Sequence, residues 1–381
     1  MSQERLIPAL RFPEFSSNWN PKRLCDVFDL MYGKDHKGLP NGKIPVLGSG
    51  GVMRYVDQAL YDQPSVLIGR KGTIDKPIYI DEPFWTVDTL FYTKIKKEYV
   101  PFFIYLLAKN IQWKKYNEAT GVPSLNTKGI NGIPVVLTCI NEQKKIADFL
   151  SSVDKKISQL KEKKTLLQEY KKGVMQQLFS QQIRFKDDDE NAFPDWQEIR
   201  ISELLKLQLN SIKMLDNEEY ELITVRRRNG GVDSRGLYKG KDVLVKTQFE
   251  LKENQFVISK RQIVHGACGV VPANLKGAIV SNEYNVFNPV PAMVDIHFFN
   301  LFSKTMPMKK AYFINSDGVH IEKLLFKTKS WLKTKVIIPC VDEQKKIVRF
   351  IGELDKKIDQ VAEQIEQTEQ FKKGLLQQMF V

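Results

Sequence analysis

The segment NEQKKIADFLSSVDKKISQLKEKKTLLQEYKKGVMQQLF, at residues 141–179, returns later in the chain as DEQKKIVRFIGELDKKIDQVAEQIEQTEQFKKGLLQQMF, at residues 342–380. The two copies align at an offset of 201 residues without a gap, and 18 of the 39 positions are identical. Self-similarity at a fixed period indicates a repeated structural unit. We conclude that this chain of 381 residues is a tandem duplication.

Both copies carry apolar residues at the alternating three- and four-residue spacing that is typical of a helix seam. Neither copy contains proline, so each is expected to be one continuous helix of about 55–60 Å. The predicted seam residues are Ile146, Leu150, Val153, Ile157 and Leu160 in the first copy, and Ile347, Ile351, Leu354, Ile358, Val361 and Ile365 in the second.

A lone helix of this kind would leave its apolar stripe in water, so each copy needs a partner helix. Because both lie in one chain, with long segments before each of them, the simplest arrangement is an antiparallel pair. Pairing between two molecules is the alternative. Lys164, Lys171 and Lys372 interrupt the stripe, so the predicted seam is imperfect.

A second, shorter repeat precedes each globular stretch. RFPEFSSNWNPKRLCDVF begins at Arg11 and FPDWQEIRISELLK begins at Phe193, with Trp19 and Trp196 each five residues before an apolar position. The globular stretches themselves show no comparable similarity. The predicted segments are an N-terminal segment (1–19), a first globular domain (20–140), a helix (141–180), a linker with the second motif (181–197), a second globular domain (198–340) and a second helix (341–381).

The fold class that follows is α+β: two mixed α/β domains separated by two long helices that form an antiparallel coiled coil, with pseudo-two-fold symmetry. The net charge of +13 lies mostly on the globular domains, which carry +5 (residues 20–140) and +8 (residues 198–340). A basic excess on the variable parts is expected if they contact phosphate, although composition alone also fits a soluble basic protein.

In the first domain, SVLIGRKGTIDKPIYI at residues 65–80 is predicted to be strand, turn and strand, with Arg70 and Lys71 at the tip. The stretch at 120–128, which ends in Lys128, is predicted to be a polar loop that faces phosphates or bases. These three cations are the candidate DNA-binding residues of the domain.

In the second domain, three consecutive arginines precede a glycine turn, Arg226-Arg227-Arg228-Asn229-Gly230-Gly231. Arginine suits phosphate and guanine edges alike, and asparagine can read adenine. A solvated basic loop is the alternative interpretation. The candidate DNA-binding residues of this domain are Arg226, Arg227, Arg228, Asn229, Arg235, Lys260 and Arg261.

No catalytic constellation is recognisable. Asn288-Pro289-Val290-Pro291 fails the pattern of an amino-methyltransferase at its third position, and Gly236 to Lys241 has the wrong spacing for a phosphate-binding loop. Four scattered cysteines and four scattered histidines predict neither disulfides nor a metal site. No apolar run approaches a membrane span and no signal peptide is recognisable, so we expect a cytoplasmic protein without membrane contact.

The combined pattern resembles the specificity subunit of type I restriction–modification systems. The resemblance is carried by Arg11-Phe12-Pro13 before Trp19, by Phe193-Pro194 before Trp196, by the paired NEQKKI and DEQKKI helices, and by their KKGxxQQxF ends. The local phrases VLIGRKGTIDKPIYI (66–80), EPFWTVDTLFY (82–92) and GAIVSNEYNVF (277–287) agree. It covers essentially the whole chain.

This resemblance implies two target-recognition domains, each reading one half of an asymmetric, interrupted sequence of double-stranded DNA, with the helices setting the distance between the halves. It implies no catalysis and no cofactor in this chain. Two methyltransferase subunits would bring S-adenosylmethionine, and two restriction/translocase subunits would bring ATP and Mg²⁺. The competing hypothesis is a coiled-coil scaffold protein that binds DNA only incidentally, and an enzyme in its own right is a third.

Overall fold

The computed structural model describes residues 7–321 and 324–381, which divide into two compact units. The first unit extends to Lys163 and also contains Val361–Val381, and the second is Lys164–Gln360. Each unit therefore combines one globular region with parts of both long helices. Among the described residues, no helix is both long enough and apolar enough to cross a bilayer.

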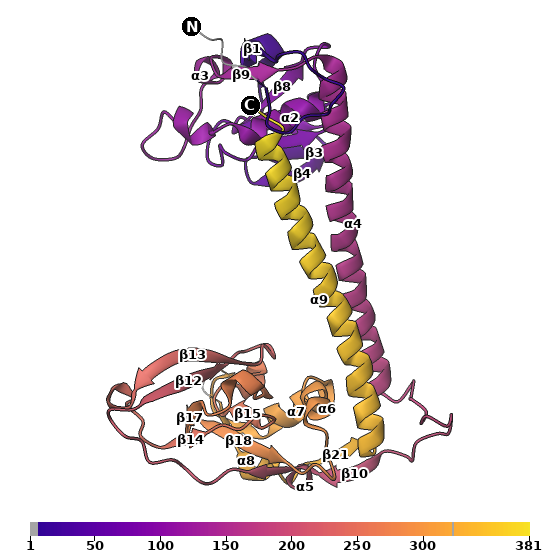
Figure 1. Cartoon of the computed structure of the whole chain (residues 1–381), viewed down its shortest axis with the longest axis vertical. Coiled ribbons are helices and arrows are strands. Elements are labelled where there is room, and N and C mark those ends of the chain that lie inside the picture. Colours follow the sequence, from indigo (N-terminus) through magenta and orange to yellow (C-terminus); the bar gives the residue numbers. More distant parts are fainter. Residues whose placement is uncertain (1–6, 322–323) are drawn as a thin grey trace. The chain divides into compact units, whose positions relative to one another are not determined.

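The repeated segments form the two longest helices, α4 (Ile140–Phe179) and α9 (Val341–Gln378) (Figure 1). Each unit holds the beginning of one helix and the end of the other, so the two run antiparallel in both units. This confirms the predicted antiparallel pair. Of the predicted seam residues, ten are buried and Ile365 is half-buried.

Two of the three lysines that interrupt the apolar stripe form ion pairs across the helix pair. In the first unit Lys372 is paired with Asp154, and in the second unit Lys171 is paired with Asp355. The two ion pairs are equivalent, because each aspartate and each lysine is related to its counterpart by the 201-residue offset. At these two positions the predicted imperfection of the seam is therefore a matched pair of partly buried ion pairs.

A second lysine lies beside each of these ion pairs. Burial lowers the pKa of Lys109, the nearby charge of Lys372 lowers it further, and Asp154 opposes both. Burial and the charge of Lys171 lower the pKa of Lys304 in the same way in the second unit. Each aspartate thus offsets two lysines at the place where a globular region meets the helices.

The globular region of the first unit begins with a short strand, β1, and ends with β9, which pairs with it antiparallel. Between them lie a four-stranded sheet in the order β2-β8-β5-β6 and a three-stranded sheet in the order β4-β3-β7. The elements are β1 (Asn20–Arg23), α1 (Leu24–Val27), β2 (Phe28–Tyr32), β3 (Asn41–Gly48), β4 (Gly51–Val56), β5 (Ser65–Gly69), β6 (Ile78–Ile80), β7 (Trp85–Thr86), β8 (Leu90–Ile95), α2 (Pro101–Asn110), η1 (Trp113–Tyr116), α3 (Thr127–Asn131) and β9 (Pro134–Leu137).

The globular region of the second unit is likewise closed by an antiparallel pair, β10 and β21. Its four-stranded sheets have the orders β11-β18-β15-β16 and β13-β12-β17-β14. The elements are β10 (Gln197–Arg200), α5 (Ile201–Leu204), β11 (Leu205–Leu207), β12 (Glu219–Val225), β13 (Val232–Lys239), η2 (Gly240–Asp242), β14 (Gln248–Glu250), β15 (Phe256–Ser259), η3 (Ile263–His265), β16 (Cys268–Val270), η4 (Ala273–Leu275), β17 (Ile279–Ser281), β18 (Tyr284–Pro289), α6 (Ile296–Phe302), α7 (Met306–Ile314), β19 (Ser316–Asp317), β20 (Leu325–Phe326), α8 (Thr328–Trp331) and β21 (Lys335–Ile338).

The two globular regions share one strand order although their sequences show no comparable similarity. The sheet β2-β8-β5-β6 corresponds to β11-β18-β15-β16, and in both all three pairings are antiparallel. The hairpin β3–β4 corresponds to β12–β13, and each has a parallel neighbour, β7 or β17. The duplication therefore includes the globular regions as well as the helices.

The duplication also extends further upstream of the helices than the sequence comparison indicated. Helices α3 and α8, and strands β9 and β21, are related by the same offset of 201 as α4 and α9. The polar loop predicted at 120–128 ends at Asn126, whose side chain caps α3, so Lys128 belongs to that helix and not to the loop.

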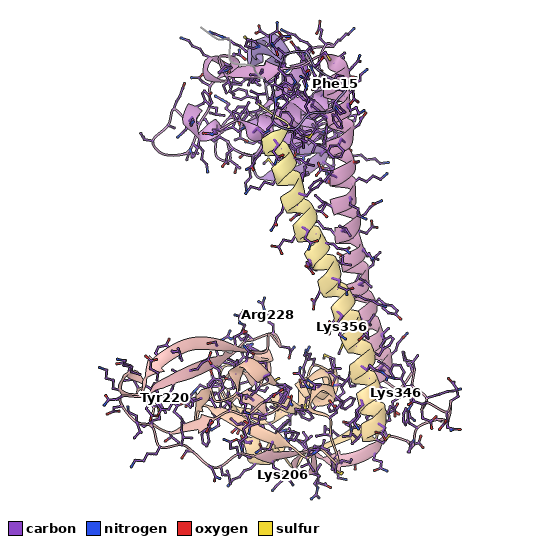
Figure 2. All side chains as sticks on the ribbon, viewed as in Figure 1. Phe15, Lys206, Tyr220, Arg228, Lys346 and Lys356 are labelled. Carbon is purple, nitrogen blue, oxygen red and sulfur yellow. The ribbon has the colours of Figure 1, made fainter. Side chains whose placement is uncertain are left out.

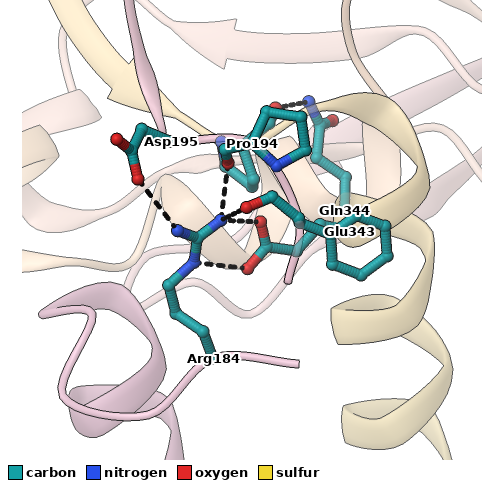
Figure 3. A network of polar contacts seen from close by, with 7 residues as sticks. Arg184, Pro194, Asp195, Glu343 and Gln344 are labelled. Carbon is teal, nitrogen blue, oxygen red and sulfur yellow. Dashed lines mark hydrogen bonds and ion pairs between the residues drawn. The ribbon is translucent and has the colours of Figure 1, made fainter. Parts of the chain in front are cut away.

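An arginine from the segment before each globular region is bound to the start of a long helix. Arg11 forms two hydrogen bonds with Glu142, and Arg184 forms two with Glu343 (Figure 3). Burial raises the pKa of Glu142, but the hydrogen bonds from Arg11 and Thr138 together hold it below its ordinary value. The two arginine–glutamate contacts are equivalent, since both glutamates occupy the same repeat position.

This contact corrects the alignment of the short repeat, which matched Phe12 with Phe193. Arg184, not a residue near Phe193, is the counterpart of Arg11, and four more residues separate it from the following tryptophan.

Phe12 packs on Phe149 and lies under Lys145. In the second copy these two roles are divided: Phe185 packs on Phe350, and Phe193 lies under Lys346.

Candidate nucleic-acid interface

The three arginines of the second unit lie at the tip of the hairpin β12–β13, which closes with the pair Val225 and Val232. Arg228 and Asn229 both have positive φ, 59° and 57°, and the amide of Gly230 donates to the carbonyl of Arg227. These are the φ signs and the hydrogen bond of a type I′ turn. Figure 2 shows Arg228 projecting from this tip.

The tip is held by the segment that follows β15. The amide of Arg228 donates to the carbonyl of His265 at 2.7 Å, and the amide of Asn229 donates to that of Gly266 at 2.9 Å. Gly266 has a φ of 75°, and a Cβ there would lie 3.1 Å from the amide nitrogen of Asn229, so glycine suits this close approach. The turn is thus fixed in place, and the Arg228 side chain, which is exposed, has no partner among the described residues.

The other arginines of this unit lie close to acidic or aromatic neighbours. Arg226 forms an ion pair with Asp233 on the opposite strand, and Arg235 lies 5.9 Å from the ring centre of Tyr238. Burial raises the pKa of Tyr284, and the charge of Arg235 opposes that effect, so Arg235 lies near the start of β18. Arg227 is exposed at the tip.

Lys260 and Arg261 directly follow β15, and the structure links them to the residues before β18. The amide of Lys260 donates to the carbonyl of Glu283, and the ammonium group of Lys260 donates to the carbonyl of Asn282. Nε of Arg261 lies 2.8 Å from the Glu283 carboxylate. The segment that holds the arginine tip begins only four residues after Arg261. The structure therefore brings the two basic motifs of this unit together.

Arg70 and Lys71 follow β5, the strand that corresponds to β15. The prediction that they form the tip of a tight hairpin is wrong, because eight residues separate β5 from β6. The amide of Arg70 donates to Thr89, and its guanidinium donates to the carbonyl of Asp88 at 3.1 Å and lies 5.4 Å from the ring centre of Tyr32. Lys71 is exposed.

A main-chain hydrogen bond connects the segment before Lys128 with Arg70. The amide of Leu125 donates to the carbonyl of Arg70 at 2.9 Å, and Lys128 follows three residues later, exposed on α3. In the second unit the amide of Phe326 donates to the carbonyl of Lys260, also at 2.9 Å, and Lys329 follows three residues later. Sequence reasoning missed Lys329, whose only signal is the Thr-Lys pair that both short helices share.

The hairpin of the first unit carries a different tip. Gly48 pairs with Gly51, so only Ser49 and Gly50 form the turn, and neither has a charged side chain.

A shallow open groove of about 680 Å³ lies beside this turn, lined by Asp35, His36, Lys37, Met53, Asp88 and Thr89 among others. Two of these residues, Asp88 and Thr89, are the ones that bind Arg70. Among the residues that the structure describes, no cluster of histidine, cysteine and acidic side chains suits a metal ion.

Comparisons with known proteins agree with this arrangement. The family model described as the type I restriction modification DNA specificity domain matches residues 16–169 and 194–370. The type I restriction enzyme MjaVIII specificity subunit of Methanocaldococcus jannaschii is 24% identical over 333 residues, which cover 82% of this chain and 74% of the relative. The putative MjaX specificity subunit of the same organism is 22% identical over 298 residues, covering 74% of this chain and 67% of the relative.

Solved structures show the same fold. The S subunit of a type I restriction–modification system from M. genitalium has a TM-score of 0.61 at 17% identity, over 98% of this chain and 99% of the other. The HsdS subunit from Thermoanaerobacter tengcongensis has a TM-score of 0.52 at 11% identity, over 95% and 96%. Since the family model matches most of the chain, the protein belongs to the type I restriction–modification DNA specificity subunits, a non-catalytic family.

Proposed function

We propose that the chain reads a bipartite, asymmetric DNA target, with one half-site for each globular region. The observation that carries this proposal is the combination of one shared strand order with two unlike hairpin tips. The first tip is Ser49-Gly50, and the second presents Arg228 and Asn229. A common scaffold with different side chains at one exposed place is what reading two different sequences requires.

The helices support the second part of the proposal, which concerns the gap between the half-sites. Equivalent ion pairs fix the register of α4 against α9 within each unit, Lys372 with Asp154 and Lys171 with Asp355. A fixed register lets the helices set the separation of the two readers, and therefore the number of unread base pairs between half-sites.

We also propose that the chain docks two methyltransferase subunits and two restriction/translocase subunits. Its membership of a non-catalytic specificity family supports this, since DNA modification and cleavage then need other subunits. S-adenosylmethionine, ATP and Mg²⁺ would bind to those partners and not to this chain.

The test is a map of adenine methylation in cells that express the cognate methyltransferase subunit with or without this chain. We expect a bipartite motif that is methylated only when the chain is present. Equal methylation in both strains would contradict the proposal and favour the scaffold hypothesis, in which DNA binding is incidental.

A further inference from the structure

We propose that each globular region carries a copy of one sequence-independent phosphate anchor. The first copy is Arg70, Lys71 and Lys128, and the second is Lys260, Arg261 and Lys329. The anchors hold the DNA backbone, whereas the hairpin tips choose the sequence. This assignment rests on the proposed function and deepens it, because it separates residues that supply affinity from residues that supply specificity.

The main-chain geometry of the two anchors is the same. The amide of the first cation donates to the carbonyl of the residue just before the neighbouring strand of the sheet, β8 or β18: Arg70 to Thr89 at 2.9 Å, and Lys260 to Glu283 at 3.0 Å. Its carbonyl accepts from the segment that leads into a short helix, at 2.9 Å in both units. Two regions without comparable sequence similarity therefore place three cations on the same frame.

The side chains follow the same division of roles. The side chains of Arg70 and Lys260 donate to equivalent carbonyls, those of Asp88 and Asn282. The first cation therefore also holds the turn that leads into β8 or β18. The second cation and the helix lysine are exposed in both units. These outer side chains, Lys71 with Lys128 and Arg261 with Lys329, reach the solvent, and Arg261 also forms an ion pair with Glu283.

Arginine and lysine exchange places between the two copies. The first position is Arg70 or Lys260, and the second is Lys71 or Arg261. Both residues can bind a guanine edge, but the planar fork of arginine fits it differently from the ammonium group of lysine, so the two are not interchangeable at a base-reading position. A phosphate requires a positive charge, which both residues supply. The exchange therefore favours phosphate as the ligand.

Equivalence itself points the same way. Two domains that read unlike half-sites can share only those contacts that carry no sequence information, and phosphate contacts are of that kind. The hairpin tips show the opposite behaviour, because they occupy equivalent places but differ in length and charge. The structure therefore separates a shared element from a variable one within each unit.

The experiment uses the chain in complex with its methyltransferase subunit and compares the variants Lys128→Gln and Lys329→Gln with wild type. Affinity is measured over a range of salt concentrations for a duplex with the methylated motif and for one with both half-sites scrambled. Matched controls are Lys22→Gln and Lys333→Gln, which remove one exposed lysine elsewhere on the same units. Circular dichroism melting establishes that all four variants are folded.

Loss of one phosphate contact should lower the slope of log K against log salt by about 0.9 and weaken binding about five- to ten-fold near 0.1 M salt. We expect this loss on both duplexes, with the methylated motif unchanged and the control variants close to wild type. Relaxed selection of one base with an unchanged salt slope would overturn the anchor assignment.

Two further outcomes are decisive. Unchanged DNA binding with lost methyltransferase association would overturn the anchor, because the equivalent surfaces would then bind two identical protein partners. A wild-type complex that binds both duplexes equally would instead overturn the proposed function. The salt slopes of the Lys128 and Lys329 variants would still report whether these residues contact phosphate, so the two failures are distinguishable.

Discussion

At the residue scale, Arg228 combines an unfavourable backbone conformation with an exposed side chain that has no partner within residues 7–321 and 324–381. A left-handed conformation costs a residue other than glycine about 1–2 kcal/mol, yet Arg228 and its neighbour Asn229 both adopt it. Main-chain bonds to His265 and Gly266 hold them there. Strain of this kind persists where surrounding contacts enforce it, and it is frequent at sites that bind ligands.

Replacing Arg228 by glycine should therefore leave the protein as stable as wild type, or more stable by up to about 1 kcal/mol, because glycine adopts positive φ without steric cost. The same change should weaken DNA binding and make the choice of bases in the second half-site less strict, since the exposed guanidinium group is lost. Thermal melting and a methylation map measure the two effects. A destabilised protein with an unchanged motif would contradict this view of the turn.

At the element scale, the helix pair depends on buried charge as well as on its apolar seam. The side chain of Lys372 is only 10% exposed and lies close to Lys109, so Asp154 is the group that compensates it. Lys171, its counterpart, is 22% exposed beside Asp355. The two equivalent ion pairs thus differ in burial, which makes each a control for the other.

We expect Asp154→Ala to cost about 2–3 kcal/mol of unfolding free energy, because it leaves a buried ammonium group unpaired. Asp355→Ala should cost less, since its lysine reaches water more easily. The double variant Asp154→Ala, Lys372→Met should recover most of the loss, because the unpaired charge is gone. Urea unfolding measures all three, and equal losses in both single variants, or no recovery in the double variant, would count against the argument.

The same elements explain what could be predicted from the sequence. A helix pair constrains individual residues at fixed spacings, so its duplication remained visible in identical letters. Strands require only alternation and apolar character, which many residues satisfy, so the shared strand order of the globular regions left no visible repeat. Lys329 was missed for this reason, and Arg184 was missed because four extra residues shift it from its counterpart, Arg11.

At the scale of the whole molecule, the duplicated chain joins two versions of one unit. Three features are repeated in each unit: an arginine bound to the glutamate at the start of a long helix, an ion pair across the helix pair, and a group of cations that follows β5 or β15. The hairpin tips differ in length and charge between the copies. Under the proposed function, the repeated features serve every target and the hairpin tips distinguish between targets.

The most direct test of the central claim, that each globular region reads its own half-site, is a methylation map after exchange of one region. Residues 24–133, which lie between β1 and β9, are replaced by the corresponding part of a family member whose half-sites are known. We predict that one half-site becomes the donor's, while the other half-site and the spacing stay as in wild type. A motif in which both half-sites change, or in which neither changes although the chimaera is present and active, would contradict the account.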